Sequence, residues 1–120
     1  MIQWLQHEAF EQELKKLRKK YPAIDDGLDK IKKLLEVQFD SVDPKEIIAP
    51  AKIHRRHQNA VWELWKVEVI VVGLRPNQWP RAWFVVSGST ITFLTLGSHI
   101  QNYDDNTMDR TALQRISDYS

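Results

Sequence analysis

The chain has 120 residues, of which 42% are hydrophobic and 28% charged, and its formal net charge at pH 7 is +1. This length favours one domain with one core, which we expect to span residues 1–120. The longest apolar run, Val69–Val72, is far shorter than the ~20 residues of a membrane-spanning helix. With no cysteine and no secretory signal at its start, the sequence favours a cytoplasmic protein without disulfides.

The first forty residues have the periodicity of two helices. The first helix is predicted from about residue 8 to residue 20, and its apolar face consists of Phe10, Leu14, Leu17 and Tyr21. Pro22 ends this helix, and Asp25 or Asp26 is expected to cap the second helix. The apolar stripe of the second helix consists of Leu28, Ile31, Leu34 and Leu35. The short break between the two helices predicts an antiparallel helical hairpin.

From residue 61 onwards the apolar period changes to two, which predicts strands. One face of the first strand is expected to be buried, and it consists of Val61, Trp65, Val67, Val69 and Val71. The other face is mixed, and it consists of Trp62, Leu64, Lys66, Glu68 and Ile70.

Two further strands are predicted at residues 81–86 and 90–96, joined by a tight hairpin in which Gly88 takes a positive φ. Asn106 or Thr107 is expected to cap a last helix. The sequence therefore predicts an α+β fold in which an N-terminal helical hairpin packs on a small antiparallel sheet, followed by a short C-terminal helix.

The basic residues gather in two stretches, Lys15–Lys20 and Lys52–His57. The first lies on a predicted helix, where a run of charges is usually the solvated face. The second lies in a loop or at a strand entrance, where a structural and a functional interpretation both stay open. His54 and His57 are spaced so that they could converge on zinc, but no third ligand is placed, and we predict no metal and no cofactor.

The tryptophans divide into two groups. Trp65 and Trp83 are expected in the core or on a sheet face, whereas Trp62 and Trp79 are expected to be half exposed near strand ends and loops. Exposed aromatic residues often mark a surface that binds a partner.

The order of the predicted elements and five degenerate segments resemble one known family. These segments are Phe10–Leu14, Lys19–Pro22, Trp62–Val67, Pro80–Val85 and Thr92–His99. Together they resemble the toxins of the RelE/ParE superfamily of bacterial toxin–antitoxin systems, over most of the chain. Arg81, which leads the strand after residue 80, is the best single match.

The resemblance implies a function. RelE-like members are endoribonucleases that enter the ribosomal A site, cleave messenger RNA and so inhibit translation, whereas ParE-like members poison DNA gyrase with a similar fold. For this chain a RelE-like toxin is expected, with a cognate antitoxin, the ribosome and messenger RNA as partners and no membrane. It would be a metal-independent enzyme that uses the RNA 2′-hydroxyl as nucleophile.

That reaction needs a base for the 2′-hydroxyl proton, a cation for the phosphorane and an acid for the leaving 5′-oxygen. Arg81 supplies a permanent, bidentate charge for the phosphorane. His99 could serve as base or acid, and Tyr103 could donate a proton or stack on a base. The predicted RNA-binding residues are Lys52, Arg55, Arg56, His57 and Lys66. His54 or His57 could be a second acid or base.

Two features depart from the nuclease pattern. Glu68 stands where many nuclease members present an arginine, and it would repel phosphate unless it acts as a base. The chain is also less basic overall than a typical ribosome-binding toxin. Two alternatives therefore stay open: a non-catalytic toxin-fold binding protein, either a ParE-like gyrase inhibitor or an inactive relative, and an unrelated small α+β interaction module.

Overall fold

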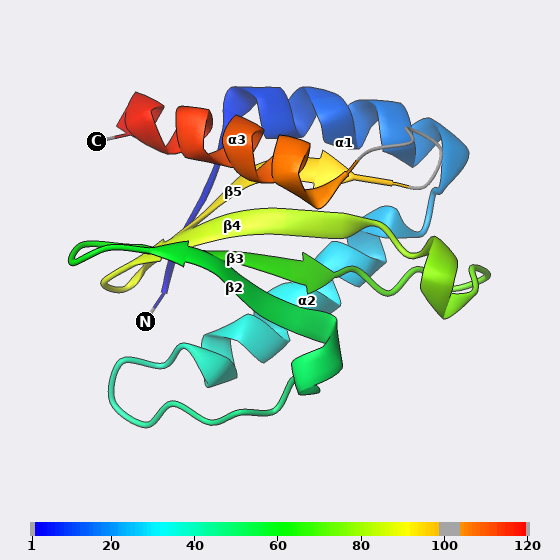
Figure 1. The fold of residues 1–120 in the computed structure, drawn as a ribbon. Helices are drawn as coiled ribbons and strands as arrows, with labels where there is room; N and C mark the ends of the chain where they lie inside the picture. Colours follow the sequence, from blue (N-terminus) through cyan, green and yellow to red (C-terminus); the bar gives the residue numbers. More distant parts are fainter. Residues whose placement is uncertain (1, 99–103, 120) are drawn as a thin grey trace.

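A computed structural model describes residues 2–98 and 104–119 (Figure 1). Its helices are α1 (Glu8–Lys20), α2 (Ile24–Gln38) and α3 (Asp105–Ile116), with short 3₁₀ turns η1 (Pro50–Lys52), η2 (Pro76–Gln78) and η4 (Ser117–Tyr119). Its strands are β1 (Gln3–Gln6), β2 (Ile53–Gln58), β3 (Glu63–Glu68), β4 (Arg81–Ser87) and β5 (Thr90–Gly97). The predicted α+β class, with two N-terminal helices and a C-terminal helix, is confirmed. In the described ranges, no helix has the length and apolar character needed to cross a membrane.

The strands form one five-stranded sheet in the order β1-β5-β4-β3-β2. β1 runs parallel to β5, while the remaining neighbours are antiparallel. The predicted hairpin between β4 and β5 is confirmed, and Gly88 has a φ of +58°. Two edge strands were not predicted as such: β1, which precedes the first helix, and β2, which covers the basic stretch at residues 53–58.

The sheet separates two buried clusters of apolar side chains. The larger one joins the sheet to α1 and α2, and its helical members are Phe10, Leu14, Leu17, Ile24, Leu28, Ile31 and Leu35. The smaller one joins the other face to α3, and it consists of Leu64, Trp83, Val85, Leu94, Met108, Ala112 and Ile116. Figure 1 shows α2 passing behind the strands, with α3 and α1 close together near β5. We refer below to the α2 side and the α3 side of the sheet.

The alternation predicted for the first central strand is confirmed where the strand exists. Leu64 belongs to the cluster on the α3 side, whereas Val67 belongs to the cluster on the α2 side. The prediction was wrong for Val61, which is 70% exposed and precedes β3 because the strand begins at Glu63. Trp83 is fully buried, as expected for a core residue.

The predicted start of the second helix was wrong. α2 begins at Ile24, its N-cap is Ala23, and no side chain caps it. Asp25 and Asp26 lie inside its first turn, where a negative charge is favourable next to the helix dipole. Asp25 instead accepts two hydrogen bonds from Arg18 of α1, at 2.6 and 3.0 Å. The connection between the helices is therefore shorter than the capping pattern indicated.

The predicted cap of the last helix was also wrong. Asp104, rather than Asn106 or Thr107, is the N-cap of α3. Its carboxylate accepts hydrogen bonds from the backbone N–H and the hydroxyl of Thr107, each at 2.8 Å. These hydrogen bonds lower the pKa of the Asp104 carboxyl, because they stabilise its charged form.

A β-bulge in β5 connects the sheet to both α1 and α3. Leu94 is the extra residue, since Trp83 pairs with Thr95 whereas the next residue of β4 pairs with Phe93. The carbonyl of Leu94 accepts a hydrogen bond from Arg115 of α3 (2.7 Å). Glu13 of α1 pairs with the same arginine (3.0 Å) and also accepts the N–H of residue 96. Side chains of α1 and α3 therefore bond two backbone groups at the bulge.

Candidate nucleic-acid interface

A second bulge, in β2, decides which basic side chains share a face. Arg55 pairs with Trp65 of β3, whereas His57 pairs with the preceding residue, so Arg56 is the extra residue. In a regular strand, neighbouring side chains point to opposite faces. Here both Arg56 and His57 reach Asp109 of α3, at 2.8 and 3.9 Å, and therefore both lie on the α3 side.

The α3 side of β2, β3 and β4 carries a group of charged residues that we call the sheet-face cluster. It consists of Lys52, Arg56, His57, Lys66, Glu68, Arg81, Asp105 and Asp109. Residues 66 and 68 are two apart on β3, and Arg81 is the direct cross-strand partner of Glu68. The ladder thus brings together five of the residues that the sequence indicated for RNA binding or catalysis.

Glu68 lies between two cations. Its Oε1 accepts a hydrogen bond from Nη2 of Arg81 at 3.0 Å, and its Oε2 is 3.8 Å from Nζ of Lys52. Arg81 also donates from Nη1 to the carbonyl of Trp79, at 3.0 Å. The Lys52 ammonium sits 4.6 Å from the centre of the Trp79 ring, a cation–π distance. The Glu68 and Arg81 side chains are 16% and 18% exposed, so both keep partial contact with solvent.

Asp109 is the most buried charge of the cluster, with 6% of its surface exposed. It accepts a bidentate pair of hydrogen bonds from Arg56, and Nε1 of Trp83 donates to it at 2.9 Å. Burial raises the pKa of the Asp109 carboxyl, but the hydrogen bonds from Arg56 and Trp83 outweigh it and hold the pKa below its usual value. Asp109 is therefore an ionised anchor that joins α3 to β2.

Lys66 pairs with Asp105 at the start of α3, with Nζ 2.8 Å from Oδ2. The cations Lys52, Arg56, Lys66 and Arg81 therefore each have a carboxylate partner among the described residues. The local charge of the cluster nearly cancels, so a phosphate would bind here only by competing with Glu68 or Asp105 for a cation.

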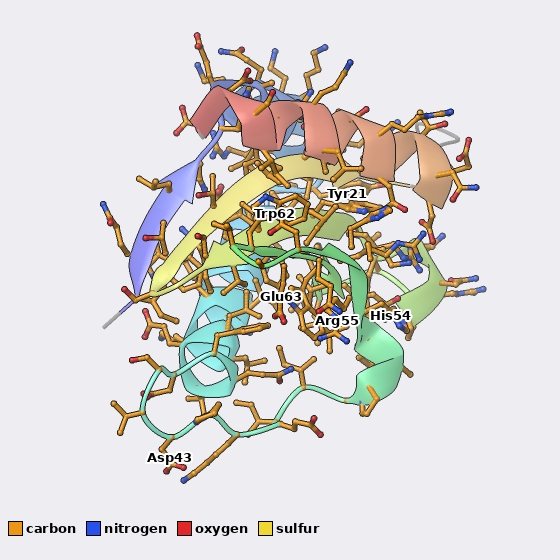
Figure 2. The ribbon with its side chains drawn as sticks, turned by 60° about the vertical axis from the view of Figure 1, so that its left-hand side comes forward. Tyr21, Asp43, His54, Arg55, Trp62 and Glu63 are labelled. Atoms are coloured by element: carbon orange, nitrogen blue, oxygen red, sulfur yellow. The ribbon has the colours of Figure 1, made fainter. Side chains whose placement is uncertain are left out.

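One of the predicted residues on β2, Arg55, lies apart from this centre. Arg55 lies on the α2 side, where it pairs with Glu63 at 3.4 Å and stacks over the Trp65 ring at 5.9 Å. Figure 2 shows Arg55 beside Glu63, with Trp62 nearer to α3. His54, by contrast, is the cross-strand partner of Lys66 and so shares its face, and its Nε2 lies 3.2 Å from the carbonyl oxygen of Ala51. Arg55 and Arg56 therefore face opposite sides of the sheet, which the sequence alone does not reveal.

The remaining predicted residues, His99 and Tyr103, lie outside the described residues. Sequence reasoning missed the two carboxylates Asp105 and Asp109. Their spacing of four residues on one helix was an available signal, because side chains at i and i+4 share a face. In the described ranges, no group of three or more His, Cys, Asp or Glu residues has the arrangement to hold a metal ion.

What the geometry can do chemically is limited and specific. The Glu68 carboxylate can accept a proton, and the neighbouring Arg81 guanidinium can donate paired hydrogen bonds to phosphate oxygens.

Searches with family models, curated proteins and solved structures gave no match to this chain. The structure itself shows a small α+β protein with N-terminal helices and a mixed five-stranded sheet. Its family is a matter of proposal.

Proposed function

We propose that this protein is a RelE-like toxin, a ribosome-dependent endoribonuclease that cleaves messenger RNA and is neutralised by a cognate antitoxin. The observation that carries the proposal is that Lys52 and Arg81 flank Glu68, with Lys66 two positions away on the same face of the sheet. The order of elements agrees with the resemblance: two helices follow a short strand, and the last helix covers the opposite side of the sheet.

In the proposed reaction the ribose 2′-oxygen attacks the adjacent phosphorus, and the bond from phosphorus to the 5′-oxygen breaks. The products are a 2′,3′-cyclic phosphate and a 5′-hydroxyl. The Glu68 carboxylate accepts the 2′-hydroxyl proton, and Arg81 donates to the phosphorane oxygens as their negative charge increases. His99 or Tyr103 gives the proton to the leaving 5′-oxygen, while Lys52 and Lys66 hold neighbouring phosphates.

A second function is favoured by one specific observation, the pairing of each cluster cation with a carboxylate. A phosphate site is more commonly rich in unpaired cations, because they attract the polyanion. This pairing fits a non-catalytic member that binds a protein such as DNA gyrase, or an inactive relative. The two functions differ in what happens to messenger RNA in the cell.

The test is induced expression in a bacterial host, with growth followed and messenger 5′ ends mapped. Wild type is compared with Arg81→Ala and with Arg81→Lys. The lysine keeps the positive charge but lacks the planar guanidinium that donates hydrogen bonds to two oxygens. Arg55→Ala is the matched control, because it removes the same charge from the other side of the sheet.

We expect wild type and Arg55→Ala to arrest growth with new 5′ ends in translated messages, and both Arg81 variants to do neither. Circular dichroism of each purified variant checks that it is folded. Arrest by Arg81→Ala with unchanged cleavage would contradict the proposed role of Arg81. Arrest by wild type with intact messages and DNA-damage signalling would support the gyrase-type function instead.

A further inference from the structure

The outer face of α1 is a second basic surface, distinct from the sheet-face cluster. Residues 14–20 contain five cations and no carboxylate. We call Lys15, Lys16, Lys19 and Lys20 the α1 ridge, and all four are exposed. A shallow groove of about 440 Å³ runs along it and is lined by Gln12, Lys15, Lys16, Arg18 and Lys19.

The charges of the α1 ridge are not neutralised by the fold. Within residues 2–98 and 104–119, no ion pair or side-chain hydrogen bond involves any of its four lysines. Arg18, at the side of the groove, is the exception and pairs with Asp25 at 2.6 Å. Unpaired ammonium groups on one helix face create a positive potential that attracts a polyanion.

The α1 ridge is held rigidly. The opposite face of α1 is buried in the larger core through Phe10, Leu14 and Leu17, each at most 6% exposed. Lysines four positions apart lie about 6 Å apart along a helix axis, and the ridge is about 7.5 Å long. At about 3.4 Å per phosphate along a strand, it faces two or three phosphates.

The lining of the groove favours a nucleic acid over a protein partner. Protein interfaces depend on buried aromatic or aliphatic anchors, and lysine is depleted in them. The residues that line this groove are one glutamine and four cations, with no apolar side chain among them. Phosphate contacts, by contrast, use lysine as a point charge and need no apolar anchor.

We propose that the α1 ridge docks the phosphate backbone of duplex RNA, without reading its sequence. The choice of RNA over DNA rests on the proposed function, in which the protein works on the ribosome. The α1 ridge lies on the helix that packs on the α2 side, whereas the sheet-face cluster lies on the α3 side. In this proposal the α1 ridge docks RNA and the sheet-face cluster cleaves it, so the two tasks belong to different surfaces.

The test measures binding of purified protein to a labelled RNA duplex of about 16 base pairs, by fluorescence anisotropy over a range of salt concentrations. The variant is Lys15→Gln/Lys19→Gln. The matched control is Lys30→Gln/Lys33→Gln, which removes two exposed lysines from α2, where carboxylates are interspersed.

We expect the α1 variant to bind about tenfold or more weakly and its plot of log K against log salt to be shallower by about 1.8, at ~0.9 per lost phosphate contact. The control is expected to bind as wild type does. Equal affinity and slope for wild type and the α1 variant would overturn the proposal. Tighter binding of poly-glutamate than of the duplex would overturn the assignment to a nucleic acid.

The result of the duplex-binding test can be distinguished from the result of the messenger-cleavage test, because duplex binding requires no cleavage. If the α1 variant loses binding while wild type cuts no message in cells, the docking site stands and the nuclease proposal fails. If wild type cuts messages and the α1 variant binds the duplex normally, the nuclease proposal stands and the docking site fails.

Discussion

The two basic regions of this molecule contain similar cationic residues, but the cations are paired with carboxylates in one region and not in the other. In the sheet-face cluster, Arg81 and Lys66 have carboxylate partners at 3.0 and 2.8 Å. On the α1 ridge, Lys15 and Lys19 have no ion pair among the described residues. A cation paired with a carboxylate is held in a fixed position, but the pair has little net charge. An unpaired cation keeps its charge and its freedom to move. The first arrangement suits chemistry at one phosphate, and the second suits docking on many.

The largest expected effect in this comparison concerns Glu68. Glu68→Gln removes the proposed base and the partner of Arg81 without changing the size of the side chain. We expect messenger cleavage by the purified protein on ribosomes to fall by about 100-fold or more, as is usual for loss of a general base. RNA affinity is expected to rise, since Arg81 and Lys52 lose a competing carboxylate. Unchanged cleavage would remove Glu68 from the mechanism.

The next largest effect concerns the buried end of the sheet-face cluster. Asp109→Ala leaves Arg56 and the Trp83 N–H without their partner, which is expected to lower the free energy of unfolding by about 3 kcal/mol. The measurement is urea denaturation. Lys15→Gln/Lys19→Gln serves as the contrast and is expected to leave the midpoint unchanged, because those side chains contact nothing that folding must preserve. Similar urea midpoints for both variants and wild type would contradict a stabilising role of the Arg56–Asp109 ion pair.

A smaller effect follows from the pKa of Asp109, which is lower in the folded protein than its usual value of 3.8. The folded state therefore binds this proton more weakly than the unfolded state does. The resulting stabilisation is complete above pH 3.8 and is lost as the pH falls through the lower folded pKa.

Urea denaturation from pH 6 to pH 2 measures this contribution. The pKa values of Asp40 and Asp104 are also lowered by hydrogen bonds, and both groups remain in an Asp109→Asn variant. The difference between wild type and Asp109→Asn therefore isolates Asp109, and it is expected to shrink towards acid pH. A difference that stays constant over this range would show that Asp109 is not an ionised partner of Arg56.

The smallest effect concerns Trp79, whose ring lies under the Lys52 ammonium. Trp79→Leu keeps an apolar side chain but removes the ring, and a cation–π contact at such a site contributes about 0.5–1 kcal/mol. We expect RNA affinity to fall by about two- to fivefold, measured by anisotropy with a single-stranded probe. The same variant is expected to leave duplex docking on the α1 ridge unchanged.

The helices and the β4–β5 hairpin could be predicted because their signals are local. The apolar residues of α1 repeat at helical spacing, and Gly88 marks the turn between β4 and β5. β2 could not be predicted as a strand from alternation, since it is an edge strand with the sequence Ile-His-Arg-Arg-His-Gln and only its first residue is buried. β1 has four residues and is held by pairing with β5, whose first residue is Thr90, which no local pattern reveals.

The candidate site could be predicted only in part, for a similar reason. Arg81 and Lys66 were found because each lies in a clear strand, and the register of the ladder then brings them together. Arg55 and Arg56 face opposite sides by ordinary strand alternation, whereas His57 joins Arg56 because of the bulge at Arg56, and a bulge is a property of the pairing. The partner Asp109 comes from a helix more than fifty residues away in the sequence.

The most direct test of the central claim is cleavage of messenger RNA by the purified protein on programmed ribosomes, with wild type beside Arg81→Ala and Arg55→Ala. The account predicts fragments with 5′-hydroxyl ends from wild type and Arg55→Ala, and at least a hundredfold slower cleavage by Arg81→Ala. Absence of cleavage by folded wild type, or equal cleavage by Arg81→Ala, would contradict it.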